Sequence, residues 1–192
     1  MNKTRLEAFS DAVIAIIMTI MVLELKIPHG TDLAALKPLL PVFLAYVLSF
    51  VYLAIYWNNH HHMLQATRKV NGKVLWANML LLFWLSLIPF ATGWMGENHF
   101  APLPTAIYGV VLLMAAISYT ILQNKLVKHT ADENKLLAEA VGSDIKGKIS
   151  LLCYAIAIPM AFVQQNISHG LYVLVALIWL VPDRRIEKVM HN

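Results

Sequence analysis

Polar and ionisable side chains interrupt the first long apolar run of the chain, between residues 5 and 28. They are Arg5, Ser10, Asp11, Thr19 and Glu24. The run is long enough to cross a bilayer, because about 20 apolar residues span its hydrocarbon core. Ionisable groups in a span are costly unless they face protein or water, so they mark candidate functional positions. The first run is therefore the place to look for chemistry.

A helical projection separates this run into two faces. At about 100° per residue, one stripe of side chains recurs at the four-three-four spacing of helices that meet side by side. The stripe consists of Arg5, Phe9, Ala12, Ile16, Thr19, Ile20, Leu23 and Ile27. Asp11 lies on roughly the opposite face, and Ser10 lies to one flank.

Two interpretations of the stripe stay open. It is either a packing seam inside a helix bundle, which the pattern alone favours, or the wall of a pore that several copies of the chain form around an axis. In the second case Ile16, Ile20 and Leu23 would stack as apolar rings, with the Thr19 hydroxyl beside them. Rings of apolar side chains constrict a pore and gate it by dewetting.

Asp11 requires a partner, because a carboxylate in a span needs a cation or several hydrogen-bond donors. The candidates at matching depth lie where the second span ends and the third begins: His60, His61, His62 and Asn78. We expect Ser10 and Asp11 to hydrogen-bond to these neighbouring helices and to fix the first helix in position. The alternative is a proton relay or ion site made of Asp11 and a histidine.

The histidine triplet does not predict a metal site. Neighbouring residues on a helix point about 100° apart, so three consecutive histidines cannot converge on one ion. The single cysteine, Cys153, lies in an apolar run and indicates neither a disulfide framework nor a cysteine metal site. No nucleophile stands beside a base at matching depth. We therefore expect no metal, no cofactor and no enzymatic activity.

The composition is that of an integral membrane protein. The 192 residues are 59% hydrophobic and 14% charged, with a mean hydropathy of +0.62. Soluble domains are nearer to about 45–50% apolar and 25% charged. The first run is too long for a secretory signal peptide, and no small-residue cleavage site precedes Pro28.

The apolar runs predict an all-α bundle of six membrane-spanning helices in one domain, residues 1–192. The spans are placed at residues 6–25, 41–63, 74–94, 105–126, 149–165 and 168–181. The polar segment 128–148 has apolar residues at helical spacing from Asn134 to Val141, which predicts a short surface helix on the cytoplasmic side. Pro159 predicts a kink in the fifth span.

The basic residues predict the orientation. With both termini in the cytoplasm, all of the 15 lysines and arginines except Lys26 and Lys37 lie on the cytoplasmic side. Cytoplasmic loops of membrane proteins carry such an excess of basic residues.

The first span resembles the signature of the transmembrane protein 175 family, which comprises lysosomal and prokaryotic potassium channels. The motif reads Arg5-x-x-x-Phe9-Ser10-Asp11 and continues AVIAIIMTIMVLELKIP. Two later segments support the resemblance: the second span closes on Trp57, His60 and His61, and the third span runs from Asn78 to Phe90. The resemblance covers nearly the whole chain.

This resemblance implies a pore and an oligomer. Prokaryotic members carry one six-span repeat and assemble as homotetramers in which the first helix lines a central pore. The family's hydrophobic constriction corresponds to Ile16, and its next apolar layers correspond to Ile20 and Leu23. A hydroxyl proposed to contribute to selectivity corresponds to Thr19. Ala15 stands where the animal form has a serine, so this chain lacks that hydroxyl.

The resemblance also gives roles to the motif residues. Arg5 and Phe9 would lie at the cytoplasmic mouth of the pore. Ser10 and Asp11 would brace the first helix against the second and third spans. The bracing partners there are His60, His61 and Asn78.

The expected function is that of a homotetrameric potassium channel, weakly selective over sodium, in the plasma (inner) membrane of a prokaryote. Its partners would be other copies of itself, membrane lipid and permeant monovalent cations such as K⁺, and not nucleic acid. A proton-conducting channel is an alternative, because animal relatives have been assigned that activity. A small secondary transporter is a second alternative, although the sequence shows no internal repeat.

Overall fold

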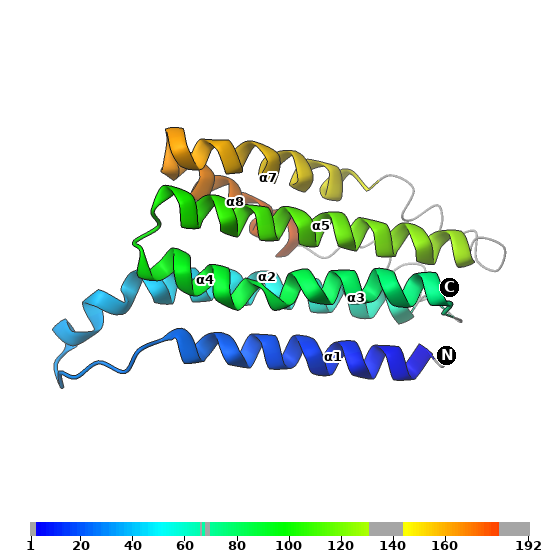
Figure 1. Cartoon of the computed structure of the whole chain (residues 1–192), viewed down its shortest axis with the longest axis horizontal. Helices are drawn as coiled ribbons and strands as arrows, with labels where there is room; N and C mark the ends of the chain where they lie inside the picture. The colour runs from blue at the N-terminus through cyan, green and yellow to red at the C-terminus, as the bar shows by residue number, and fades with distance from the viewer. Residues whose placement is uncertain (1–2, 66, 68–69, 131–143, 181–192) are drawn as a thin grey trace.

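The computed structural model describes residues 3–65, 67, 70–130 and 144–180. Every regular element within these residues is helical, which confirms the predicted all-α fold. The helices lie side by side along the long axis of the molecule, with α1 along one edge and α7 along the other (Figure 1).

Each predicted span has a helical counterpart in the described residues. The bounds are Lys3–Ile20 for α1, Leu40–Gln65 for α2, Gly72–Ser86 for α3, Ile88–Glu97 for α4, Pro102–Thr130 for α5, Ile145–Val163 for α7 and Gln165–Leu180 for α8. Five helical stretches in this part of the chain are long and apolar enough to cross a membrane, and α8 is a shorter apolar helix. The surface helix expected at residues 134–141 lies outside the described residues.

The fifth and sixth spans meet at a sharper turn than the sequence suggested. Helix α7 ends at Val163 and α8 begins at Gln165, so only Gln164 separates them. The backbone of Gln164 is extended (φ −152°, ψ 90°), and its N–H donates to the carbonyl of Met160 at 2.8 Å. The sixth helix therefore begins three residues before the predicted position.

The third span is interrupted in its second half, and Pro89 gives the reason. A proline in a helix has no N–H to donate, and its ring crowds the carbonyl four residues earlier. Helix α3 accordingly stops at Ser86, and α4 starts at Ile88 with Pro89 in its first turn, where the missing N–H costs nothing. The two helices together fill the span.

Helix α1 tightens before it ends. Met21–Glu24 forms a 3₁₀ turn, and Leu25 is extended (ψ 104°). Tight turns of this kind are frequent at helix C-termini. The chain then passes through Lys26 and Pro28 to a second 3₁₀ stretch, Leu33–Leu39, which leads into α2.

One end of the bundle carries most of the described basic residues. The start of α1, the end of α2, the start of α3, the end of α5 and the start of α7 lie at this end (Figure 1). The lysines and arginine of these segments are Lys3, Arg5, Lys73, Lys125, Lys128, Lys146 and Lys148. Lys26 and Lys37 lie in the connection at the opposite end. This distribution agrees with the asymmetry from which the orientation was predicted.

The interior contains paired hydroxyl groups as well as apolar side chains. Thr92 donates to Ser49 at 2.7 Å, Ser49 and Tyr108 lie 2.9 Å apart, and all three side chains are buried. These contacts join α2, α4 and α5. Paired hydroxyls of this kind hold helices together where no water is present to satisfy them.

Candidate functional site

Helix α1 packs through one face only. It lies against α2, α3 and α4, and the covered side chains are Leu6, Ser10, Ile14, Ile17 and Met21. These recur every three or four residues, as expected for one face of a helix. The opposite face of α1 has no described protein over it.

The stripe found in the sequence lies on this open face. The exposed fractions are 50% for Phe9, 56% for Ile16, 42% for Ile20 and 76% for Leu23. Arg5, Ala12 and Thr19 are exposed as well. The stripe is therefore not a packing seam within one copy of the chain. Large apolar side chains in a row need lipid or further protein over them.

Thr19 has a fixed hydroxyl on the same face. Its Oγ1 donates to the carbonyl of Ile16 at 2.9 Å. A hydroxyl has one hydrogen and two lone pairs. Because the hydrogen is used inside the helix, the lone pairs of Thr19 remain available as acceptors on the open face.

A groove runs between α1 and the α3–α4 span. Its volume is about 710 Å³, and it is open on one side. Ile16 and Ile20 form one wall, and Pro89 and Phe90 form part of the other. Glu24 and Glu97 lie at the end of the groove that faces the Lys26 connection. The apolar stripe therefore borders a hollow large enough to receive side chains of another copy.

A buried hydrogen-bond chain holds α1 to α2 and α3. The Nε2 of His60 donates to Asn78 Oδ1 at 2.7 Å, and Asn78 Nδ2 donates to Ser10 Oγ at 2.9 Å. Ser10 Oγ in turn donates to the carbonyl of Leu6 at 2.9 Å. Ser10, His60 and Asn78 are fully buried. The direction of each hydrogen bond follows from its neighbour, because the Leu6 carbonyl and Asn78 Oδ1 can only accept.

Asp11 has a different partner from those expected. Trp57 Nε1 donates to Asp11 Oδ1 at 3.1 Å, so an indole takes the place of the histidine or Asn78 suggested by the sequence. Asp11 is half-buried on the flank of α1, while Ser10 points into the bundle. The projection put Asp11 opposite the stripe and Ser10 on a flank, whereas in the structure Ser10 is the buried residue and Asp11 the half-buried one.

His61 lies in a third cluster at the same end. Its Nδ1 is 3.2 Å from Glu7 Oε1, its Nε2 is 2.8 Å from Gln65 Nε2, and its ring stacks on Trp57 with 5.9 Å between centroids. Lys3 Nζ donates to the carbonyl of Gln65 at 3.0 Å. The first turns of α1 are thus tied to the last turns of α2.

The three histidines point to different surroundings. His60 faces the bundle interior, His61 faces Glu7, and His62 lies beside the His61 ring. Among the described residues, no three His, Cys, Asp or Glu side chains come close enough to hold a metal ion. The described arrangement therefore offers no candidate metal centre.

Sequence reasoning missed Glu7, Trp57 and Gln65 as contact residues of this end. Trp57 precedes His61 by four residues, and His61 precedes Gln65 by four, so all three share one face of α2. That spacing was the available signal. It would have placed Trp57 and His61, rather than His60, beside the flank of α1 that carries Glu7 and Asp11.

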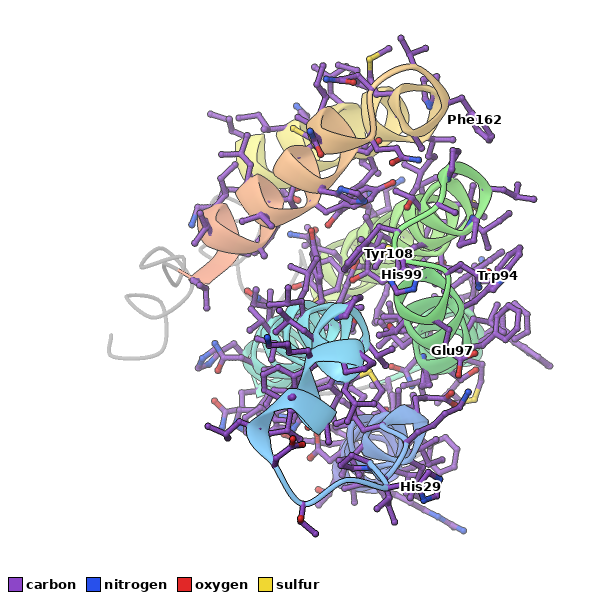
Figure 2. The ribbon with its side chains drawn as sticks, turned by 90° about the vertical axis from the view of Figure 1, so that its left-hand side faces the viewer. His29, Trp94, Glu97, His99, Tyr108 and Phe162 are labelled. Atoms are coloured by element: carbon purple, nitrogen blue, oxygen red, sulfur yellow. The ribbon has the colours of Figure 1, made fainter. Side chains whose placement is uncertain are left out.

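The opposite end of the bundle carries an ion pair. Lys26 Nζ lies 2.6 Å from Glu97 Oε1. The hydrogen bond and charge of Glu97 raise the pKa of Lys26 above its ordinary value. Figure 2 looks onto this end, with Glu97 and Trp94 on α4 and His29 below them near α1. The pair links the segment after α1 to the end of α4, beside the groove.

Comparison with known proteins places the chain among channels. Residues 5–89 match the model of the family described as the endosomal/lysosomal potassium channel TMEM175. The chain is 57% identical over 192 residues to a potassium channel of Chryseobacterium sp. strain P1-3, covering 100% of both chains. It is 33% identical over 103 residues to the human endosomal/lysosomal proton channel TMEM175, which covers 47% of this chain and 20% of that protein.

The fold has a solved counterpart. The crystal structure of a lysosomal potassium-selective channel TMEM175 homolog from Chamaesiphon minutus superposes with a TM-score of 0.80 at 26% identity. The match covers 94% of this chain and 97% of that one. The similarity therefore extends over the whole bundle and is not confined to α1.

Proposed function

The chain belongs to the TMEM175 family of channels, and from this membership we propose that it is a potassium-selective cation channel with α1 lining the pore. The family is one of ion channels and not of enzymes. Three bacterial relatives that align over 90% or more of this chain carry the name potassium channel. The chain is a multi-pass membrane protein, and we propose the inner membrane of a prokaryote as its location.

The open face of α1 is the observation that supports this proposal. Ile16 and Leu23 are more than half exposed, while Ile14 and Ile17 on the other face are buried. Four copies around an axis would bring Ile16, Ile20 and Leu23 into successive rings. The apolar stripe would then face a narrow column of water rather than lipid.

In this arrangement Ile16 is the gate. A ring of isoleucine side chains offers a cation nothing in exchange for its hydration water, so a narrow ring loses water and blocks conduction. Opening would require the four side chains to move off the axis. The Thr19 lone pairs, one turn further along, would supply acceptors to a partly dehydrated K⁺. Such a site discriminates weakly over Na⁺, because it lacks a cage of carbonyl oxygens.

Flux through liposomes tests the gate. Replacing Ile16 by Asn puts a polar group at the proposed constriction, so potassium flux from vesicles with the purified chain should rise about tenfold or more. Val22→Asn is the matched control, because Val22 is 47% exposed in the 3₁₀ turn that follows α1 and is not part of the stripe. It should leave the flux within about twofold of the parent. An equal rise in both variants, or no change in either, would remove Ile16 from the gate.

A proton-conducting function is the second candidate, because the animal relatives are named proton channels. The buried chain from His60 to Ser10 does not favour it as a proton path. It ends on the Leu6 carbonyl, which can only accept, and it passes through an amide that does not readily relay protons. Protons would instead need water inside the pore. Proton flux that disappears in Asp11→Ala, with potassium flux intact, would establish a separate proton function.

A further inference from the structure

A basic pocket lies at the end of the bundle away from the Lys26 connection. Its volume is about 220 Å³, and it is lined by Asn71, Lys73, Lys125 and Lys128. Lys73 is in the first turn of α3, and Lys125 and Lys128 are in the last turns of α5. The pocket therefore sits where the ends of two packed helices meet.

Within the described part of the chain, the three lysines have no negative partner. Among the described residues, no carboxylate lies within ion-pair distance of any of them. Lys125 and Lys128 are three residues apart on one helix and so share a face. Like charges gathered around one hollow repel each other, and an anion between them relieves that repulsion. The general excess of basic residues at this end explains why lysines occur there. It does not explain why three of them line the same pocket.

The neighbouring side chains set the pocket at the level of lipid headgroups. Trp76, one turn after Lys73, is 80% exposed, and Leu80 and Phe83 continue the same face of α3 with 39% and 54% exposed. Ile121, one turn before Lys125 on α5, is 36% exposed. Tryptophan is enriched at the membrane interface, with its ring at headgroup depth. The lysines thus lie immediately above an apolar face that meets the acyl chains.

From this juxtaposition we propose that the pocket formed by Lys73, Lys125 and Lys128 binds the phosphate of an anionic phospholipid. The headgroup enters between the ends of α3 and α5, and its acyl chains lie along Trp76 and Leu80. The N-terminus of α3 adds to the attraction, because the N-terminal end of a helix favours anions. The side chain of Asn71 already caps Val74 N at 3.0 Å, so the lysines supply most of the binding.

Lipid titration of the full chain, followed by native mass spectrometry in detergent, tests the proposal. The parent protein should bind phosphatidylglycerol more tightly than phosphatidylcholine. Each lysine near an anionic surface contributes about 1 kcal/mol, so Lys125→Gln should weaken phosphatidylglycerol binding about fivefold. Lys148→Gln is the matched control, because Lys148 is an exposed lysine at the same end but outside the pocket. It should change binding less than twofold.

Replacing all three pocket lysines together should change lipid binding more than Lys125→Gln alone. Replacing Lys73, Lys125 and Lys128 by Gln should abolish the preference for phosphatidylglycerol, and replacing all three by Arg should keep it. These side chains are exposed, so the variants should elute from gel filtration like the parent. An unchanged preference in the glutamine variant would overturn the proposal, and so would an equal loss in Lys148→Gln.

Inorganic phosphate separates a lipid from a soluble ligand. In millimolar excess and at matched ionic strength, it should not displace phosphatidylglycerol, because it gains nothing from the apolar face below the pocket. Displacement at that concentration would show that the pocket takes free phosphate, which overturns the lipid assignment. The readout is binding and not ion flux, so this test can fail while the channel function stands, and the reverse also holds.

Discussion

Ser10 shows how one small polar residue can position α1 in the bundle. The other described side chains on the covered face of the first span are Leu6, Ile14, Ile17 and Met21, which are all apolar. The Ser10 hydroxyl uses both its donor and an acceptor, on the Leu6 carbonyl and on Asn78. In a water-free interior each of these hydrogen bonds is costly to leave unmade. The contact therefore fixes both the rotation of α1 and its height against α3.

Removing Asn78 should release this contact. Asn78→Ala leaves the Nε2–H of His60 without its acceptor and Ser10 Oγ without its interhelical donor, while Ser10 still donates to the Leu6 carbonyl of its own helix. Interhelical hydrogen bonds in membranes average about 0.6 kcal/mol each, so we expect the free energy of unfolding to fall by about 1–2 kcal/mol. Chemical or thermal unfolding in detergent measures the change. Asn58→Ala, at a half-exposed position on α2, is the control and should stay within about 0.5 kcal/mol. Equal losses in the two variants would contradict the role of the network.

At the scale of single residues, the sequence did not predict which side chains contact each other, because those contacts depend on side-chain geometry. Helical periodicity placed Asp11 opposite the stripe and Ser10 on one flank, and depth placed both near the end of α2. Which of them met Asn78 depended on the rotation of α1 in the bundle, about which periodicity alone says little. The donor of Trp57 was also overlooked, because an indole near a span end suggests an interface anchor before it suggests a carboxylate partner.

At the scale of the helices, close approach of backbones depends on particular glycines. A Cβ added at Gly96 on α4 would lie 2.7 Å from the Cα of Val42 on α2. Backbone atoms cannot move aside as the end of a side chain can. Small residues at such crossings let membrane helices pack tightly. The contact between α2 and α4 therefore requires glycine at this position.

Gly96→Ala should lower the free energy of unfolding by about 1–3 kcal/mol, the usual cost of overpacking a tight contact. Gly72→Ala is its counterpart, because a Cβ at Gly72 meets nothing within 4 Å. That variant should leave stability unchanged or raise it by up to about 1 kcal/mol, since alanine restricts the unfolded chain. The two unfolding midpoints, measured side by side, decide the matter. A Gly96→Ala protein as stable as the parent would mean that α4 can shift away from α2 without cost.

The helices themselves were largely predictable, for a physical reason. A segment in lipid must satisfy its backbone hydrogen bonds internally, so a long apolar run leaves little choice but a helix. Helix boundaries were less predictable where a single local hydrogen bond sets them. At Gln164, for example, the backbone N–H closes the last turn of α7. The break at Leu87 follows from Pro89, but a proline near a span end predicts a kink as readily as two helices.

At the scale of the whole molecule, a single copy has an incomplete surface. The stripe on α1 and the groove beside it are apolar, and within the described residues nothing covers them. Phe162 on α7, at 59%, is equally exposed, and it lines a smaller hollow of about 210 Å³. Lipid can cover a smooth helix face, whereas a groove of about 710 Å³ is better filled by protein side chains. This favours assembly through the α1–α4 side.

The last prediction concerns how copies of the chain assemble. We expect native mass spectrometry of the purified chain to give four copies, and Phe90 to be part of the contact between them. Phe90 is 62% exposed on the groove wall, so in a tetramer its ring would pack against the neighbouring copy. Phe90→Ala should raise the tetramer dissociation constant at least about tenfold, equivalent to about 1.4 kcal/mol. Phe162→Ala removes a ring of similar exposure from the α7 side (Figure 2) and should leave the tetramer intact. A monomeric parent protein would refute the four-fold pore. A tetramer that is insensitive to Phe90→Ala would show that the copies meet through another face, so the α1 stripe would not lie around the proposed four-fold axis.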